Sequence, residues 1–443
     1  NKIAFKDVVV RNYCSPEPAH GGWGAQEAEP VAFAFVDGGS VAIGTSQTTL
    51  ATLYTSFPSG NNFVMAIVQV QCGTSSTISS GSLWLQRVGG GILMSNYYAI
   101  DAGGSADARK WQALMGIDSS AGASPSYTVS ASASNTAMTG EAKILAISGV
   151  TGAQTTYVEV DIDNSETTLA TLATSLQAGD NIVLAIFETI NTGTGTKSLS
   201  YVRLKRSATL AESQLPLWHG ASGTAGARQC QLIPYLDASA PTSPTYTATA
   251  QEGASGLKIK GAAKIVAFRK NLQAGDLQTA YVDGSQQTLP GGTESYIASL
   301  STDFQTGSDV VVIASEQFAS ADFYTRQIAA GANKLQYMDL ADGQRVNEYI
   351  IYTREGGSSP VGDCGAGFGL LNRHTNILAY NPDIFKTKAT ASADSILAES
   401  KILALGHKPP GVPEFPLGAL LPLATGLATS YAARKVRKRI PRS

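Results

Sequence analysis

The sequence repeats itself internally, and this repetition constrains the fold more than any other feature of the 443-residue chain. Residues 48–53 (TTLATL) recur as residues 167–172, and residues 124–128 (SPSYT) recur as residues 243–247 (SPTYT), both at an offset of 119. An offset that stays constant over nearly 80 residues indicates tandem copies of one structural unit. Since a chain of this length holds about three domains, we expect those domains to be copies of one another.

A third, more divergent copy follows the first two. Residues 296–300 and Gly307 align with the second copy at an offset of 128, and residues 400–405 (SKILAL) resemble the closing run at 140–147 (GEAKILAI). We therefore predict copies at residues 31–150, 151–270 and 271–407, followed by a linker at 408–414. Two interpretations fit residues 1–30: an extra strand of the first domain, or a strand exchanged with a neighbouring subunit.

Within each copy the residue pattern is that of β-strands. Residues 63–72 begin as a continuous apolar run and then alternate, with Val68, Val70 and Cys72 on one face. Residues 127–134 alternate between apolar or small residues and Thr or Ser, which is typical of a half-buried antiparallel strand. With Gly/Ser-rich turns and no helical periodicity, each copy is predicted to be a β-sandwich, so the fold class is all-β. The order of parts resembles the jelly-roll modules of phage fibres and microbial surface proteins, which implies three tandem jelly-roll-like domains.

Charge divides the chain into two parts. The formal net charge is −2, but residues 1–407 carry 25 bases and 33 acids, whereas the remaining residues carry seven bases and one acid. An acidic body excludes nucleic acid as a partner, because binding phosphates requires a basic face. Residues 415–433 contain no charge and would cover roughly 28 Å as a helix, enough to cross a membrane. The alternative is a buried core helix.

The C-terminal segment is predicted to be a membrane anchor, with residues 434–443 on the cytoplasmic or interior side. The anchor residues are Phe415, Leu420, Leu423, Leu427, Arg434, Lys435, Arg437, Lys438 and Arg439. Residues 413–416 (PEFP), the apolar stretch and the basic cluster together resemble the archaeal PEF-type C-terminal sorting signal. This resemblance implies an archaeal, exported protein attached to the cell envelope, with its body outside.

Little in the sequence points to catalysis. The four histidines, His20, His219, His374 and His407, lack metal-ligand spacing, and neither a nucleophile elbow nor a phosphate-binding loop is present. A carboxylate pair that meets only in space would not be visible in the sequence. We expect no enzymatic activity.

Four acidic residues and one asparagine cluster at one place in the second copy. They are Glu159, Asp161, Asp163, Asn164 and Glu166. Oxygen ligands gathered in this way could hold Ca²⁺, the only cofactor that the sequence suggests. The alternative, which we favour, is an acidic solvent face that protects an edge strand from unwanted pairing.

The cysteines allow three pairings in an oxidising compartment. They are Cys14, Cys72, Cys230 and Cys364. Cys14 and Cys72 are the two near the first domain, so we expect this pair to attach the N-terminal segment. Cys230 and Cys364 would have to bridge two domains, or would remain buried thiols.

Together these features predict a membrane-anchored structural protein of an archaeal cell surface, appendage or virion, with a second copy of itself as its main partner. The alternative is a carbohydrate-binding adhesin, with glycans as ligands. The tryptophans Trp23, Trp84, Trp111 and Trp218 do not recur at equivalent repeat positions, which weighs against three equal sugar sites.

Overall fold

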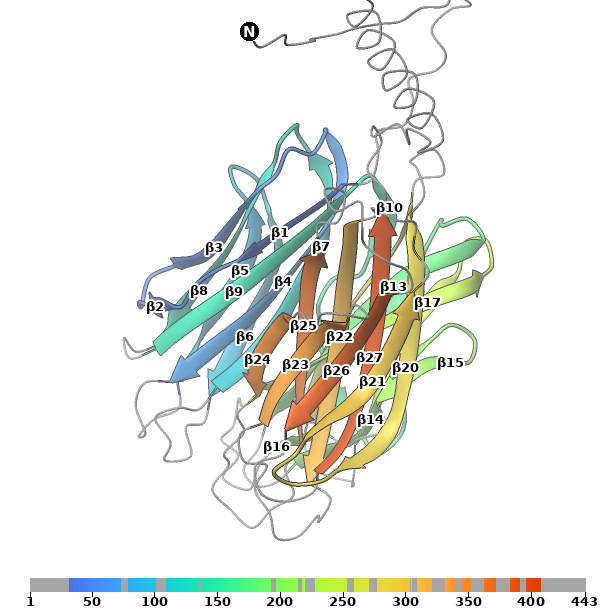
Figure 1. Ribbon diagram of the computed structural model, residues 1–443. Coiled ribbons are helices and arrows are strands. Elements are labelled where there is room, and N and C mark those ends of the chain that lie inside the picture. Colours follow the sequence, from blue (N-terminus) through green and yellow to red (C-terminus); the bar gives the residue numbers. More distant parts are fainter. Residues whose placement is uncertain are drawn as a thin grey trace, which may run out of the picture.

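The computed structural model describes most of the predicted repeats (Figure 1). The described residues are 32–72, 79–100, 109–134, 138–192, 197–213, 217–219, 228–252, 259–270, 277–302, 304, 309–320, 331–338, 345–351, 362–371, 383–390 and 396–407. None of them forms a helix with the length and apolarity that a membrane crossing requires. The predicted N-terminal strand at 1–30, the linker, the anchor and the basic tail lie outside the described residues.

The described chain consists of 27 strands in three successive sets. The first set is β1 (Phe33–Asp37), β2 (Val41–Ile43), β3 (Thr48–Tyr54), β4 (Gly60–Cys72), β5 (Ser79–Arg87), β6 (Ile92–Ile100), β7 (Arg109–Ala121), β8 (Ser126–Ala133) and β9 (Met138–Ser148). The second set is β10 (Val150–Gln154), β11 (Glu159–Ile162), β12 (Thr167–Ala173), β13 (Gly179–Asn191), β14 (Lys197–Lys205), β15 (Thr209–Ser213), β16 (Leu217–His219), β17 (Arg228–Ala240), β18 (Thr245–Glu252) and β19 (Ile259–Lys270). The third set is β20 (Gln278–Leu289), β21 (Glu294–Thr302), β22 (Asp309–Ser320), β23 (Gly331–Met338), β24 (Arg345–Ile351), β25 (Gly362–Leu371), β26 (Asp383–Thr390) and β27 (Ile396–His407).

Each set forms two antiparallel sheets with one topology. In the first set the sheets have the orders β1-β9-β4-β7, with β2 also on β9, and β3-β8-β5-β6. The second set repeats them as β10-β19-β13-β17 and β12-β18-β14-β15, and the third as β20-β27-β22-β25 and β21-β26-β23-β24. Alternation of successive strands between two four-stranded sheets in this order is the jelly-roll arrangement. The predicted all-β fold is therefore confirmed, and each repeat has jelly-roll topology.

The sheets that contain β4, β13 and β22, here called the inner sheets, form the centre of the molecule. The continuous apolar run predicted at the start of β4 is buried on both faces, from Phe63 to Val68. Farther along the strand Val70 is buried while Gln69 and Gln71 are partly exposed, as the alternating pattern predicts. A strand covered on both faces needs a second layer besides its own sandwich partner. The neighbouring repeats supply that layer, and one apolar core cluster extends through all three repeats.

The repeats pack against one another in cyclic order. The first strand of each repeat contacts the edge strand of the preceding inner sheet: β10 packs on β7, β20 on β17, and β1 on β25. The last of these contacts joins the first repeat to the third and closes the ring. In Figure 1 the first repeat is blue to teal, the second mainly green and the third yellow to red. The three copies therefore form one body with approximate threefold arrangement, held by three versions of one contact.

Equivalent side chains make these three contacts. The equivalent residues, which pair with Leu145, Val266 and Leu403 of the closing strands, are Phe35, Gln154 and Tyr281. Phe35 lies edge-on to Phe368 of the third repeat, with ring centroids 6.0 Å apart. Tyr281 lies 5.1 Å from Tyr235 in the same manner. Gln154 hydrogen-bonds both the amide and the carbonyl of Ile117 at 3.0 and 3.1 Å. The contact is thus aromatic at two junctions and polar at the junction between the first two repeats.

A buried polar group explains several residues that recur at the offset of 119. Asn62 donates to the hydroxyl of Tyr127 at 2.8 Å, and Tyr127 donates to Asp118 at 3.2 Å. Arg87 pairs with the same carboxylate at 2.9 Å. The second repeat contains the corresponding group, made by Asn181, Arg206, Asp237 and Tyr246. These repeated polar residues are therefore structural, because a buried carboxylate needs partners for its charge.

Candidate functional site

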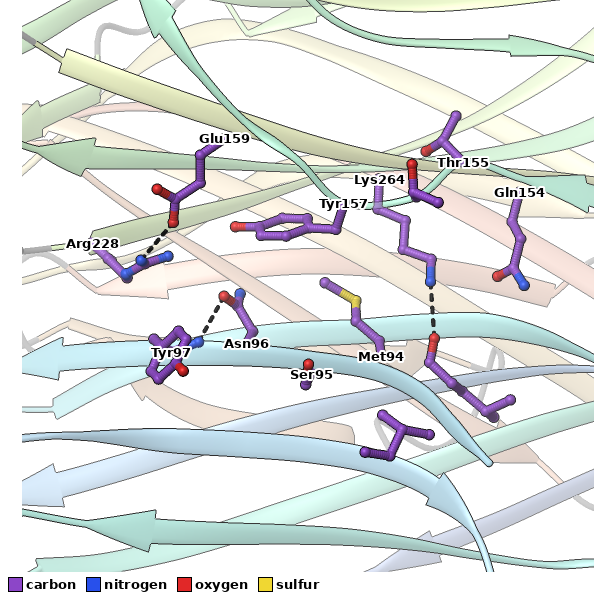
Figure 2. A pocket seen from close by; sticks show the side chains of 13 residues that line it. Met94, Ser95, Asn96, Tyr97, Gln154, Thr155, Tyr157, Glu159, Arg228 and Lys264 are labelled. Carbon is purple, nitrogen blue, oxygen red and sulfur yellow. Dashed lines mark hydrogen bonds and ion pairs between the residues drawn. The ribbon is translucent and has the colours of Figure 1, made fainter. Parts of the chain in front are cut away.

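A pocket of about 670 Å³ lies at the polar junction between the first two repeats (Figure 2). Residues 92–97 of β6 form one wall, and residues 154–157, which begin at the last residue of β10, form the other. Glu159, Arg228 and Lys264 complete the lining from the second repeat. The pocket exists because β10 ends at Gln154 and the chain leaves the inner sheet before β11 begins.

Behind the pocket, a fully buried carboxylate joins the two repeats. Glu188 of β13 accepts hydrogen bonds from Gln112 at 3.0 Å and Asn96 at 3.2 Å, both in the first repeat. It also pairs with Arg228 at 2.8 Å and accepts a hydrogen bond from Tyr157. Burial outweighs these donors and raises the pKa of Glu188 from 4.5 to about 7. The junction therefore contains a carboxyl group that titrates near neutral pH.

Lys264 lines the pocket without a carboxylate partner. Its equivalents in the first and third repeats form ion pairs, Lys143 with Asp37 at 2.7 Å and Lys401 with Asp283 at 2.5 Å. Lys264 instead crosses the junction and donates to the carbonyl of Leu93 at 3.0 Å, as Figure 2 shows. It is 5% exposed, and burial alone lowers the pKa of its ammonium group from 10.5 to about 8.

The sequence of the second repeat explains why Lys264 has no aspartate opposite it. Gln154 is equivalent to Phe35, so the position equivalent to Asp37 is occupied by Thr156. The amide of Thr155 donates to the carbonyl of Ile265, and the hydroxyl of Thr155 accepts from the amide of Ile265, both at 2.9 Å. This register places Thr156 opposite Lys264. A threonine therefore stands where the other two repeats have an aspartate.

Apolar side chains surround the opening of the pocket. The described residues include six large hydrophobic side chains that are exposed, and three of them belong to this region: Ile92, Tyr97 and Val158. Ile92 and Tyr97 line the pocket, and Val158 lies between the lining residues Tyr157 and Glu159. Arg228 also lies over the ring of Tyr97, 5.5 Å from its centroid. Exposed apolar groups gathered at one pocket are a feature of binding sites.

The predicted calcium ligands do not converge on one point. Glu159 lies beside the pocket and pairs with Arg228 at 2.8 Å. Asp163 accepts hydrogen bonds from the amide and the hydroxyl of Ser165, and these bonds lower the pKa of its carboxyl group. Glu166 pairs with Lys205 at 3.1 Å. Among the described residues no group of three or more His, Cys, Asp or Glu side chains is placed to hold a metal ion. Glu159 and Asp161 lie on β11, which pairs with β19 at the margin of the inner sheet.

The predicted Cys14–Cys72 disulfide stays untested, because Cys14 and the side chain of Cys72 lie outside what the structure describes. Cys230 is a buried thiol at the same junction as Glu188, and its Sγ lies 3.5 Å from the amide nitrogen of Ala113. Burial raises the pKa of this thiol, so it stays protonated.

The pocket was not predicted from the sequence. One signal for it was present: the Ala-Lys-Ile run at 142–144 recurs at 263–265, and the Val-Asp-Gly runs at 36–38 and 282–284 have no counterpart in the second repeat. A lysine that recurs while its acidic partner does not is the mark of this site.

Comparisons with known proteins find no matching family model and no matching curated protein. Among solved structures, the chain is similar to one described as the triple jelly roll fold and turret assembly in an archaeal virus. The two are 10% identical, with 86% of this chain and 90% of the other covered and a TM-score of 0.19. The STIV MCP gives 7% identity, 58% and 98% coverage and a TM-score of 0.24. PNGase F, a glycosylasparaginase from Flavobacterium meningosepticum, gives 8% identity, 58% and 95% coverage and a TM-score of 0.29. At such TM-scores these likenesses carry no argument about function.

Proposed function

We propose that this chain is a structural protein that self-associates into a surface coat, appendage or virion shell. The observation that carries the proposal is the closed ring of three jelly rolls, in which β1 packs on β25 as β10 packs on β7 and β20 on β17. A continuous core through three domains makes one rigid block rather than three mobile modules. A rigid block of approximate threefold form is well suited to a closed or planar lattice.

The second sheet of each repeat, here called the outer sheet, offers a surface for association between such blocks. The first strand in the order of each outer sheet, which is β3, β12 or β21, is an edge strand. Two of these edge strands carry exposed tyrosines, Tyr54 at 79% and Tyr296 at 46%. Sheet edges and exposed aromatic residues are both common in protein interfaces, because edges pair with other strands and aromatic rings bury large apolar areas.

The membrane anchor and the external position of the body are part of this proposal, and they rest on residues 415–443 of the sequence. The proposal also includes the absence of enzymatic activity. The calcium site is left as the weaker of two interpretations, because Glu159 and Glu166 already have cationic partners.

The test is to image the full chain in membrane vesicles by electron cryo-tomography, beside a variant that carries Tyr54→Lys. We expect an ordered array for the unchanged chain and loss of order for the variant, at an unchanged melting temperature. Isolated, randomly spaced monomers of the unchanged chain at all surface densities would refute the proposal. Such monomers that bound glycans would favour the adhesin instead.

A further inference from the structure

We propose that the pocket between the first two repeats binds an acidic sugar, whose carboxylate pairs with the ammonium group of Lys264. This site goes beyond the proposed structural function and does not depend on it. Three observations support the proposal: a cation without its counter-ion, the charge balance of the lining, and the chemistry of the walls.

The first observation is the comparison between repeats. The fold places a lysine at this position three times, and in two of the three cases an aspartate of the first strand neutralises it. In the second repeat the strand ends early, Thr156 replaces the aspartate, and the open volume begins beside the ammonium group. A buried charge without a counter-ion is costly, and a bound carboxylate would remove that cost.

The second observation concerns the other charges that line the pocket or lie behind it. Among the described lining residues Arg228 pairs with Glu159 at 2.8 Å, and Lys264 has no carboxylate partner, so this lining holds one positive charge in excess. Glu188 lies behind the pocket, where it contacts Arg228 rather than Lys264. One uncompensated positive charge matches a ligand with a single negative charge, rather than a phosphate dianion.

The third observation concerns the shape and polarity of the walls. A pocket of about 670 Å³ is far larger than a small inorganic ion needs. The rings of Tyr97 and Tyr157 can contact the apolar C–H face of a sugar ring, and Figure 2 shows Tyr157 between Arg228 and Lys264. Ser95 and Thr156 bring hydroxyl groups to the same space. Apolar faces alternating with hydroxyl groups fit a carboxylated sugar better than an aliphatic acid.

The experiment measures binding to the full chain in detergent by saturation-transfer NMR and isothermal titration calorimetry. The probes are glucuronate, glucose, acetate and inorganic phosphate. We expect glucuronate to bind at least about tenfold more tightly than glucose or acetate, because it alone provides both the charge and the ring. Equal binding of glucose would overturn the role of charge, and binding of acetate or phosphate as tight as that of glucuronate would overturn the role of the sugar. Failure of all four probes to bind would overturn the proposal.

Two variants and one control test the residues themselves. Lys264→Met removes the ammonium group, and Thr156→Asp supplies the internal counter-ion found in the other repeats. We expect either change to weaken glucuronate binding at least about tenfold, while Lys143→Met, at the equivalent position in the first repeat, leaves it unchanged. One pocket variant removes a positive charge and the other adds a negative charge. The two changes therefore share their effect on the charge of the pocket, and a loss in both points to that charge. Wild-type affinity in either pocket variant, or an equal loss in the control, would overturn the proposal.

Discussion

Replacing Glu188 with glutamine should remove most of the pH dependence of stability between about pH 5 and pH 8. The carboxyl of Glu188 has a pKa of about 7 in the folded chain against an ordinary value of 4.5. Because the folded pKa is raised, the folded state gains stability from this group at pH values below 4.5. That stability is lost as the pH rises through 7. At about 1.36 kcal/mol for each pH unit between the two values, the loss is about 3 kcal/mol.

The assay is urea unfolding of the full chain in detergent at pH 5, 6, 7 and 8, followed by tryptophan fluorescence. We expect the free energy of unfolding of the wild type to fall by about 2.5 kcal/mol over this range, because the first part of the loss occurs below pH 5. Glu188→Gln should give a nearly flat profile, because an amide in the same hydrogen-bonded position does not ionise. The difference in slope between the two pH profiles then measures the cost of burying the ionised carboxylate at the junction of two repeats.

Glu166→Gln is the matched control. Glu166 lies near the surface, and its pKa is lowered first by the hydrogen bond from Thr249 and then by Lys205. A lowered pKa places its contribution below pH 4.5, so this variant should keep the wild-type slope between pH 5 and 8. A wild-type profile that is flat, or one that rises with pH, would show that Glu188 is ionised in the fold and would refute the reasoning.

Other substitutions test the packing and the charges. Lys264→Met should raise the free energy of unfolding at pH 7 by up to about 3 kcal/mol, measured by urea unfolding, because burial lowers the pKa of the lysine from 10.5 to about 8. This gain should shrink as the pH rises from 8 to 10.5, where the buried lysine is already neutral. Asp118→Ala leaves Arg87 and the buried hydroxyl of Tyr127 without their acceptor and should cost about 3 kcal/mol, whereas Asp37→Ala, at an exposed pair, should cost less than about 1 kcal/mol; a similar loss for both would contradict this. Phe35→Ala removes the aromatic contact between the first and third repeats and should cost about 2–3 kcal/mol, measured by urea unfolding, with earlier protease cleavage between repeats. Added Ca²⁺ should leave the melting temperature unchanged, and a rise would support the calcium site at residues 159–166 instead.

The repeat pattern predicted the strands well because local pattern and tertiary position agree there. In β8 the residues Tyr127, Val129, Ala131 and Ala133 are buried on one face, as the alternation predicts. The opposite face is less exposed than the pattern suggests, since Ser130 is also buried. Small polar residues in a crowded sheet do not reveal what covers them, so their burial is set by packing that the sequence pattern does not contain.

The closed ring of three repeats and the pocket could not be predicted from the sequence, for a different reason. Contacts such as Phe35 with Phe368 join residues that are far apart in the chain and have no periodic relation to each other. Glu188 likewise gains its environment from Asn96 and Gln112 of another repeat, so nothing beside it in the sequence indicates a raised pKa. Comparing the repeats position by position was the one route to Lys264.

Joining the three jelly rolls in one chain also changes how such a block behaves on dilution. A trimer of separate chains falls apart when its concentration drops below its dissociation constant, whereas the closure of β1 on β25 is an event within one molecule. Because the three repeats are parts of one chain, their sequences can differ, and the three junctions need not be identical. One junction is built from Phe35, another from Gln154 and a third from Tyr281. A block with three distinguishable sides can carry a direction, and its neighbours in an assembly could recognise which side they meet.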